Sequence, residues 1–367
     1  MSSADPHQPV RPSSAPAISR RHLLALGVGA GAALPLGAIA ALAVPGGRPP
    51  LDFPICDSSL KLAAVEGPAQ RTALTVAWNP TAICTAAAPV AKEAGFFEKN
   101  NLDVSFVSFG SSTEQLLESI ATGKADAGLG MALRWLKPLE QGFDVKITAG
   151  IHGGCMRLIG SQQAGTTTLQ SLKGKVIAVS DQASPDKNFF SIVLAKNGID
   201  PINDVEWRQY PLDLLALAVQ KGEAQALTAG DPLAFLWRRD PGLVEIANNL
   251  SGEYAHRTCC VIGIRGSLLR SNKPAAAALT RAFLEAGNFV AEKPDEAVKI
   301  YAKYGMKGSP EDLAAMLKSH THHDHPLGAD LKGQIADYAK ELKTVNVFKP
   351  STDTAKFADR VYADVLS

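Results

Sequence analysis

The chain has 367 residues, of which 46% are hydrophobic, with 37 basic and 36 acidic side chains. The resulting net charge of +1 excludes the strongly basic surface that nucleic-acid binding needs, so we expect no nucleic-acid partner. The length is sufficient for two lobes with substantial cores, and a small neutral or singly charged ligand suits this composition.

The first apolar run is an uncharged segment at 23–44. Its length is sufficient for a membrane span, but Gly and Pro interrupt it and an Ala-Leu-Ala site lies at 41–43, which favours a cleaved signal. Residues 19–24, Ser-Arg-Arg-His-Leu-Leu, resemble the twin-arginine signal for export of folded proteins. We therefore predict a twin-arginine signal peptide at 1–43, export to the periplasm, and a Pro-rich linker at 44–71. Ordinary secretion and a retained anchor are the alternatives.

Strand-like and helical hydrophobic periods alternate from residue 72 onward, which predicts an α/β fold with a mainly parallel sheet. The pattern restarts near residue 173. The stretches at 120–131 and 218–232 are similar: in each, a helix that ends in Gly is followed by a strand of small residues. This similarity indicates two lobes of related construction. The expected strands lie at 72–78, 102–109, 125–130, 144–151, 173–180 and 204–210, and the expected helices at 86–100, 111–123, 131–142, 184–198 and 211–222.

Four stretches of the sequence resemble the solute-binding proteins of ABC importers for nitrate, sulfonates and taurine. This family includes binders of thiamine precursors. The four stretches lie at 88–106, 110–130, 172–180 and 219–227. The resemblance implies a type II periplasmic binding protein, in which two α/β lobes joined by two crossing segments close on a ligand by hinge motion. Lobe 1 is expected at 72–155 and 262–367, and lobe 2 at 156–261. The expected protein is a monomer that delivers a small organic or inorganic anion to an ABC permease with its ATPase.

The ligand site of such a fold is expected beyond the carboxyl ends of the strands, where helix N-termini aim N–H groups outward. Hydroxyl groups there suit a sulfonate, carboxylate or nitrate oxygen, although each Ser or Thr is equally well interpreted as a helix N-cap. Arg134 is interpreted either as the counter-charge or as a solvated surface residue. The candidates from strand ends are Asn79, Thr81, Ser111, Ser112, Thr113, Met131, Asp181, Ser184 and Asp231.

The first crossing is expected at 147–160, which contains the stretch HGGCMR at 152–157, and the second crossing is expected at 256–267. The two glycines of HGGCMR permit close backbone approach. The remaining ligand candidates are His152, Gly153 and Cys155. A hydrogen-bonded core histidine is the alternative for the first of them. Crossings that run side by side would bring Cys155 near the Cys259–Cys260 pair, which is otherwise interpreted as two buried small hydrophobic side chains.

The polar stretch SHTHHDHP at 319–326 contains four histidines, a density that can bind a transition metal. Connections between helices usually face solvent, and flexible histidines without orienting partners bind weakly, so we expect no metal and no cofactor. The sequence contains no phosphate loop, no H-E-x-x-H motif and no Ser-His-Asp order, which favours a binding protein over an enzyme. The alternatives are an enzyme or binder of the thiamine-pyrimidine-precursor type, and a metal-dependent receptor that uses this loop.

Overall fold

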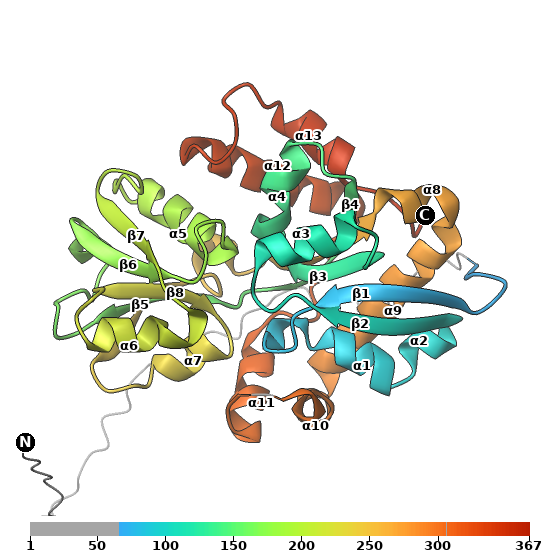
Figure 1. The fold of residues 1–367 in the computed structure, drawn as a ribbon, viewed down its shortest axis with the longest axis horizontal. Coiled ribbons are helices and arrows are strands. Elements are labelled where there is room, and N and C mark those ends of the chain that lie inside the picture. Colours follow the sequence, from blue (N-terminus) through green and yellow to red (C-terminus); the bar gives the residue numbers. More distant parts are fainter. Residues whose placement is uncertain (1–65, 306) are drawn as a thin grey trace, which may run out of the picture. The chain divides into compact units, whose positions relative to one another are not determined.

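The computed structural model describes residues 66–305 and 307–367 (Figure 1). The expected signal peptide, most of the expected linker and Cys56 lie outside these residues. Within the described part, we find no helix with the length and apolar character that a membrane crossing requires.

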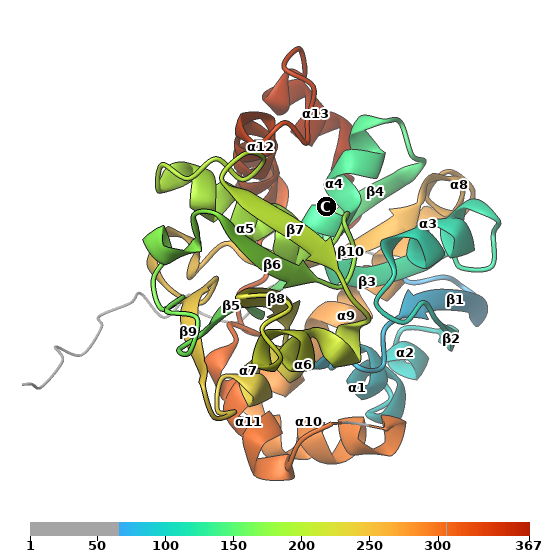
Figure 2. The same cartoon turned by 60° about the vertical axis from the view of Figure 1, so that its left-hand side comes forward.

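Two five-stranded sheets form the framework (Figures 1 and 2). In the first, β1 runs parallel to β2 and β3, while β10 runs antiparallel to β3 and β4. In the second, β6 runs parallel to β7 and β8, while β5 runs antiparallel to β8 and β9. Each sheet is therefore mainly built from β-α-β units and closed by antiparallel strands, which confirms the expected two-lobed α/β fold.

The strand order in the first sheet is β2 (Leu102–Ser108), β1 (Thr72–Trp78), β3 (Ala127–Met131), β10 (Thr258–Arg265) and β4 (Val145–Gly153). The order in the second is β7 (Val205–Gln209), β6 (Lys175–Val179), β8 (Ala226–Gly230), β5 (Met156–Ser161) and β9 (Leu243–Asn248). The region at 256–267, expected as a crossing, is mostly strand β10 because its apolar run completes the first sheet. The first sheet thus resumes at Thr258, before the expected lobe boundary at residue 262.

Alternating strand residues reach cores on opposite faces of each sheet. Val76 packs with α1 and α9, whereas its neighbour Ala77 packs in the core that contains α3 and α4. Leu158 and Ile159 likewise belong to different cores of the second sheet. Helix α5 accordingly covers one face of that sheet, and α6 and α7 cover the other (Figure 1).

The helices largely follow the predicted periods, with breaks where the backbone requires them. Gly95, at φ +79°, divides the expected helix at 86–100 into α1 and α2. The helices are α1 (Ala87–Glu93), α2 (Phe96–Lys99), α3 (Thr113–Ala121), α4 (Ala132–Glu140), α5 (Pro185–Lys196), α6 (Leu215–Gln220), α7 (Leu233–Trp237), α8 (Gly266–Ser271), α9 (Lys273–Glu292), α10 (Pro294–Tyr301), α11 (Pro310–Ser319), α12 (Gly328–Thr344) and α13 (Thr354–Val361).

Two crossing segments connect the sheets, one between β4 and β5 and the other between β9 and β10. The backbone N–H of Cys155 in the first donates to Asn249 Oδ1 in the second at 2.8 Å. A Cβ atom on Gly154, whose φ is +74°, would lie 2.0 Å from Leu250 Cδ2. The crossings therefore run side by side, and the close approach expected of the glycine pair is present.

Candidate functional site

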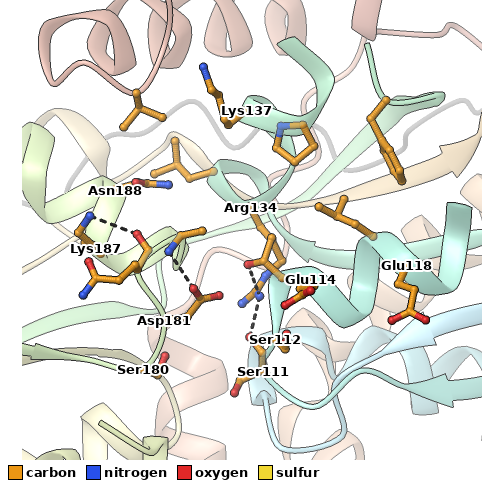
Figure 3. A pocket seen from close by; sticks show the side chains of 18 of the residues that line it. Ser111, Ser112, Glu114, Glu118, Arg134, Lys137, Ser180, Asp181, Lys187 and Asn188 are labelled. Carbon is orange, nitrogen blue, oxygen red and sulfur yellow. Dashed lines mark hydrogen bonds between the residues drawn. The ribbon is translucent and has the colours of Figure 1, made fainter. Parts of the chain in front are cut away.

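A cavity of about 890 Å³ is lined by residues from both lobes (Figure 3). Arg134 and Ser112, from the first lobe, lie on one side, and Asp181 and Lys187, from the second lobe, lie on the other. The first pair follows the ends of β2 and β3 and the second pair follows the end of β6, so the strand ends supply the cavity as the sequence predicts.

Two helices begin at this cavity, each capped by a serine. Ser112 Oγ accepts a hydrogen bond from Gln115 N at 3.3 Å at the start of α3. Ser184 Oγ accepts from Lys187 N at 3.3 Å at the start of α5. The N-cap interpretation therefore holds for both serines. Ser112 also lines the cavity, whereas Ser184 is not among the residues that line it.

Arg134 is the most enclosed cation of the cavity. Its side chain is only 7% exposed, so the interpretation as a solvated surface residue is wrong. Its Nη1 donates to Ser111 O at 2.7 Å and to Thr113 Oγ1 at 2.8 Å, which holds the guanidinium beside the start of α3. Burial lowers the pKa of Arg134, and a guanidinium remains charged in proteins even so. The site therefore keeps a poorly hydrated positive charge.

An acidic residue lies across from this arginine at the start of α5. Asp186 is 4% exposed and accepts a hydrogen bond from Thr228 Oγ1 at 2.6 Å. Burial raises the pKa of Asp186, although Thr228 and the charge of Arg134 act in the opposite direction. On the cavity wall itself, burial lowers the pKa of Lys187, whose Nζ donates to Gln182 O. The cavity therefore presents a buried cation of one lobe and a partly buried cation of the other.

A smaller pocket of about 50 Å³ adjoins Arg134 and collects five of the predicted ligand residues. They are Asn79, Thr81, Ser111, Met131 and Asp231. Asn79 Oδ1 accepts two hydrogen bonds from Thr81, one from its backbone N–H at 3.0 Å and one from the Thr81 hydroxyl at 2.8 Å. The side chain of Asn79 therefore fixes the turn after β1 with its oxygen, which leaves its amide group as the donor.

Asp231 already has partners for both of its carboxylate oxygens. Arg157 donates Nε to Oδ1 at 2.9 Å and Nη2 to Oδ2 at 3.0 Å, and His320 Nε2 lies 2.9 Å from Oδ2. Burial would raise the pKa of Asp231, but the hydrogen bonds from His320 and Arg157 hold it below its usual range. This carboxylate stays ionised and orients its partners, rather than offering a free oxygen to a ligand.

The histidine-rich loop after α11 is buried, contrary to the expectation that it faces solvent. His320, His322 and His325 are at most 8% exposed, and His323 is the exposed member of the four. The loop covers β4, which is the edge strand of the first sheet. It does so through hydrogen bonds from Gly153 N to Thr321 Oγ1 and from Gly150 N to Pro326 O. The edge strand needs these partners for its N–H groups, which is why the loop is drawn inward.

His152, Gly153 and Cys155 lie beside this loop and do not line either cavity. Cys155 Sγ lies 3.3 Å from Cys259 Sγ, which confirms the expected approach of the two crossings. The ring of His152 lies 4.7 Å, centre to centre, from that of His322. Two of these predicted ligand residues, His152 and Cys155, thus belong to a buried cluster of sulfur and imidazole groups, and Gly153 binds the loop through its backbone.

Electrostatic interactions within this cluster favour thiolate and imidazolium forms at particular positions. Hydrogen bonds from Cys155 and Cys260 lower the pKa of Cys84 well below its usual range. The same two residues lower the pKa of Cys259. Burial opposes the charged form of His152, but the nearby Cys84 thiol raises its pKa. Sequence analysis missed Cys84 because no metal-type spacing marks it.

The two lobes, their crossings and the cavity at the strand ends define the class of the protein as a two-lobed periplasmic-binding-protein fold. A family model described as NMT1/THI5 like matches residues 85–297, more than half of the chain. The chain belongs to the NMT1/THI5-like family. No curated protein matches the chain significantly.

Solved structures with the same fold include the following three proteins. The alkanesulfonate-binding protein SsuA from Xanthomonas axonopodis pv. citri, bound to MOPS, has 19% identity and a TM-score of 0.66, over 79% of this chain and 99% of that chain. The periplasmic nitrate-binding protein NrtA from Synechocystis PCC 6803 has 16% identity and a TM-score of 0.68, over 82% and 88%. A zinc-bound ligand-binding component of an ABC-type import system from Staphylococcus aureus has 15% identity and a TM-score of 0.66, over 80% and 97%.

Proposed function

We propose that this protein is a periplasmic solute-binding receptor that holds a small anion between its lobes and delivers it to an ABC importer. The observation that carries the proposal is the buried guanidinium of Arg134 at the wall of the interlobe cavity. Membership of the NMT1/THI5-like family and the fold shared with sulfonate- and nitrate-binding proteins support it.

The electrostatics of the cavity support an anionic ligand. A cation held in a poorly solvated site attracts a negative group more strongly than an exposed one does. The start of α3 lies beside Arg134, and the start of α5 lies on the opposite lobe; each helix N-terminus adds partial positive charge. A ligand oxygen between them would receive donors from both lobes, which is what favours a closed state over an open one.

The size and composition of the cavity narrow the ligand class. A volume of about 890 Å³ falls within the range of ordinary small-molecule sites and exceeds what nitrate needs. Asp181, Glu114 and Glu118 also line it, so a ligand that carries an amine beside its acidic group would find partners for both. An organic sulfonate or carboxylate, including an amino sulfonate such as taurine, suits this wall better than nitrate does.

The residues that line the two cavities also favour a binding role over an enzymatic one. The residues of the described part that line the two cavities include no His and no Cys. Those are the groups that thiamine-pyrimidine chemistry would use, and here they lie in the buried cluster instead. A receptor that binds and releases its solute unchanged needs no such groups at the cavity.

The decisive experiment is a thermal-shift screen of taurine, alkanesulfonates, carboxylates and nitrate, followed by calorimetric titration of each ligand that raises the melting temperature. Arg134→Met should weaken binding of the best ligand at least about tenfold, because a hydrogen bond to a charged group contributes about 1.5–3 kcal/mol. Lys221→Met, which removes one positive charge from an exposed position outside the cavity, is the matched control. Equal affinity of both variants, or turnover of a bound ligand, would overturn the proposal.

A further inference from the structure

Five sulfur and nitrogen donors surround one small buried volume. The Sγ atoms of Cys84 and Cys260 and a ring nitrogen of His152 all lie within 4.8 Å of one another. The Sγ atoms of Cys155, Cys259 and Cys260 form a second such set. Cys260 is common to both sets, and all five side chains are at most 2% exposed.

The donors come from three segments that are far apart in the sequence. Cys84 lies in the short helix η1 (Ile83–Thr85) after β1. His152 lies one residue before the end of β4 and pairs with Cys260 of β10, while Cys155 follows in the first crossing. The ladder between β10 and β4 shifts register on both sides of Cys260. Adjacent residues of a regular strand point to opposite faces, so this irregularity explains how Cys259 and Cys260 both approach Cys155.

Unpartnered polar atoms mark the same place. Among the described residues, His152 Nε2 and both ring nitrogens of His322 are buried without a hydrogen-bond partner. A buried polar atom without a partner is destabilising, and these atoms lie on two rings in contact.

We propose that Cys84, His152 and Cys260, together with Cys155 or Cys259, bind one soft transition-metal ion, either zinc or copper(I). Thiolate and imidazole donors select these ions over magnesium or calcium. Four ligands at about 2.0–2.3 Å in a tetrahedron lie about 3.3–3.8 Å apart, so Cys84, His152 and Cys260, whose donor atoms lie within 4.8 Å of one another, need only small shifts. The fourth ligand, Cys155 or Cys259, already lies within 4.8 Å of Cys260 Sγ and must move toward the other two donors. Binding replaces the thiol protons, which pass to solvent, and involves no oxidation.

The site would connect the first crossing segment to strand β10 and to the turn after β1. Cys155 lies on that crossing, Cys259 and Cys260 lie in β10, and Cys84 belongs to the first lobe. Cys260 also pairs with Met131, which lines the small pocket beside Arg134. With Cys155 as the fourth ligand, a bound metal would therefore fix one of the two crossings to the first lobe. The metal proposal stands on its own donors and does not depend on the anion.

The test uses the full chain, purified with a thiol reductant and stripped with a chelator. Titration with Co²⁺ should give one equivalent of binding, a thiolate-to-metal charge-transfer band and the intense visible bands of a tetrahedral ion. Zn²⁺ should displace the cobalt, and competition with a copper(I) chelator shows which ion binds more tightly. Cys84→Ser and Cys260→Ser should each weaken the charge-transfer band, to which the remaining thiolates still contribute, and lower the affinity at least about tenfold, the scale of a lost metal-ligand interaction.

Two variants serve as controls. Cys56→Ser removes the fifth cysteine, which lies outside the described residues, and His323→Asn removes the exposed histidine of the loop. Both should bind the metal as the wild type does. If a serine variant fails to fold by circular dichroism, the alanine variant at the same position replaces it, and His152→Ala tests the nitrogen ligand.

Three results would overturn the metal proposal. The first is the absence of stoichiometric metal binding by the reduced wild type, and the second is retention of metal binding by both the Cys84 and Cys260 variants. The third is a loss of metal affinity in the two control variants that equals the loss in the Cys84 and Cys260 variants. A Cys155–Cys259 disulfide found by mass spectrometry, with no metal binding after reduction, also counts against it. Anion affinity is measured separately with Arg134→Met, so failure of one proposal is distinguishable from failure of the other.

Discussion

His320 Nε2 lies 2.9 Å from Asp231 Oδ2, and both side chains are fully buried. The histidine follows α11, which packs against α9 of the first lobe, and the aspartate follows β8 of the second sheet. Arg157 of β5 completes the arrangement by binding both oxygens of the same carboxylate. The buried carboxylate of Asp231 thus binds both Arg157 of the second lobe and the His320 loop of the first lobe.

Replacing Asp231 with Asn should destabilise the protein by about 3–5 kcal/mol, because it leaves the buried guanidinium of Arg157 without its main counter-charge. Urea unfolding measures the loss. Glu245→Gln is the matched control, since Glu245 also binds Arg157 but its side chain is 21% exposed. We expect Glu245→Gln to lower the free energy of unfolding clearly less than Asp231→Asn does. Equal losses would mean that the buried Arg157–Asp231 pair stabilises the protein no more than the partly exposed Arg157–Glu245 pair.

Ser112→Ala should reduce both stability and ligand affinity. The structure shows Ser112 as the N-cap of α3, so its loss should cost about 1 kcal/mol of stability. Ser309→Ala removes an equivalent N-cap from α11, where Ser309 Oγ accepts from Asp312 N at 3.1 Å. We expect the two variants to lose similar stability in urea unfolding and only Ser112→Ala to lose affinity. Unchanged affinity would leave Ser112 with a capping role alone.

The metal-free protein should lose stability as the pH falls from about 6.5 to about 4, because burial and then the charge of His152 lower the pKa of His325 to about 4. As the pH falls through this window, His325 is protonated in the unfolded chain before it is protonated in the folded protein. The free energy of unfolding therefore falls by about 3 kcal/mol, and this loss is complete below the pKa of His325 in the folded state. Urea midpoints measured across the window should change less steeply in His325→Gln. His323→Gln, at the exposed position, should keep the wild-type slope.

Gly154→Ala should be more destabilising than an alanine at another glycine with positive φ. Its φ of +74° alone disfavours a side chain by about 1–2 kcal/mol, and the added Cβ would also meet Leu250 of the other crossing. Gly222→Ala is the control, because its φ is +77° and nothing lies within 4 Å of the new atom. Similar melting temperatures for the two variants would show that the crossings separate easily at this point.

Local signals in the sequence determined the alternation of strands and helices and the helix starts at Ser112 and Ser184, because periodicity and capping depend on neighbouring residues. They also placed the polar residues of the cavity at strand ends. Strands β5, β9 and β10 were missed: β5 and β10 lie largely within the segments interpreted as crossings, and β9 is a short edge strand whose residues are mostly half-buried.

Only the tertiary structure decided which polar residues line a cavity and which bind one another. Arg134 is buried because the start of α3 accepts its hydrogen bonds, and Asp231 is occupied because β5 places Arg157 beside it. The histidine loop turns inward because the edge strand β4 needs hydrogen-bond partners. Cys84 joins Cys260 through the packing of η1 against β10, a contact between distant segments that no local spacing encodes, because it depends on how the sheet is assembled.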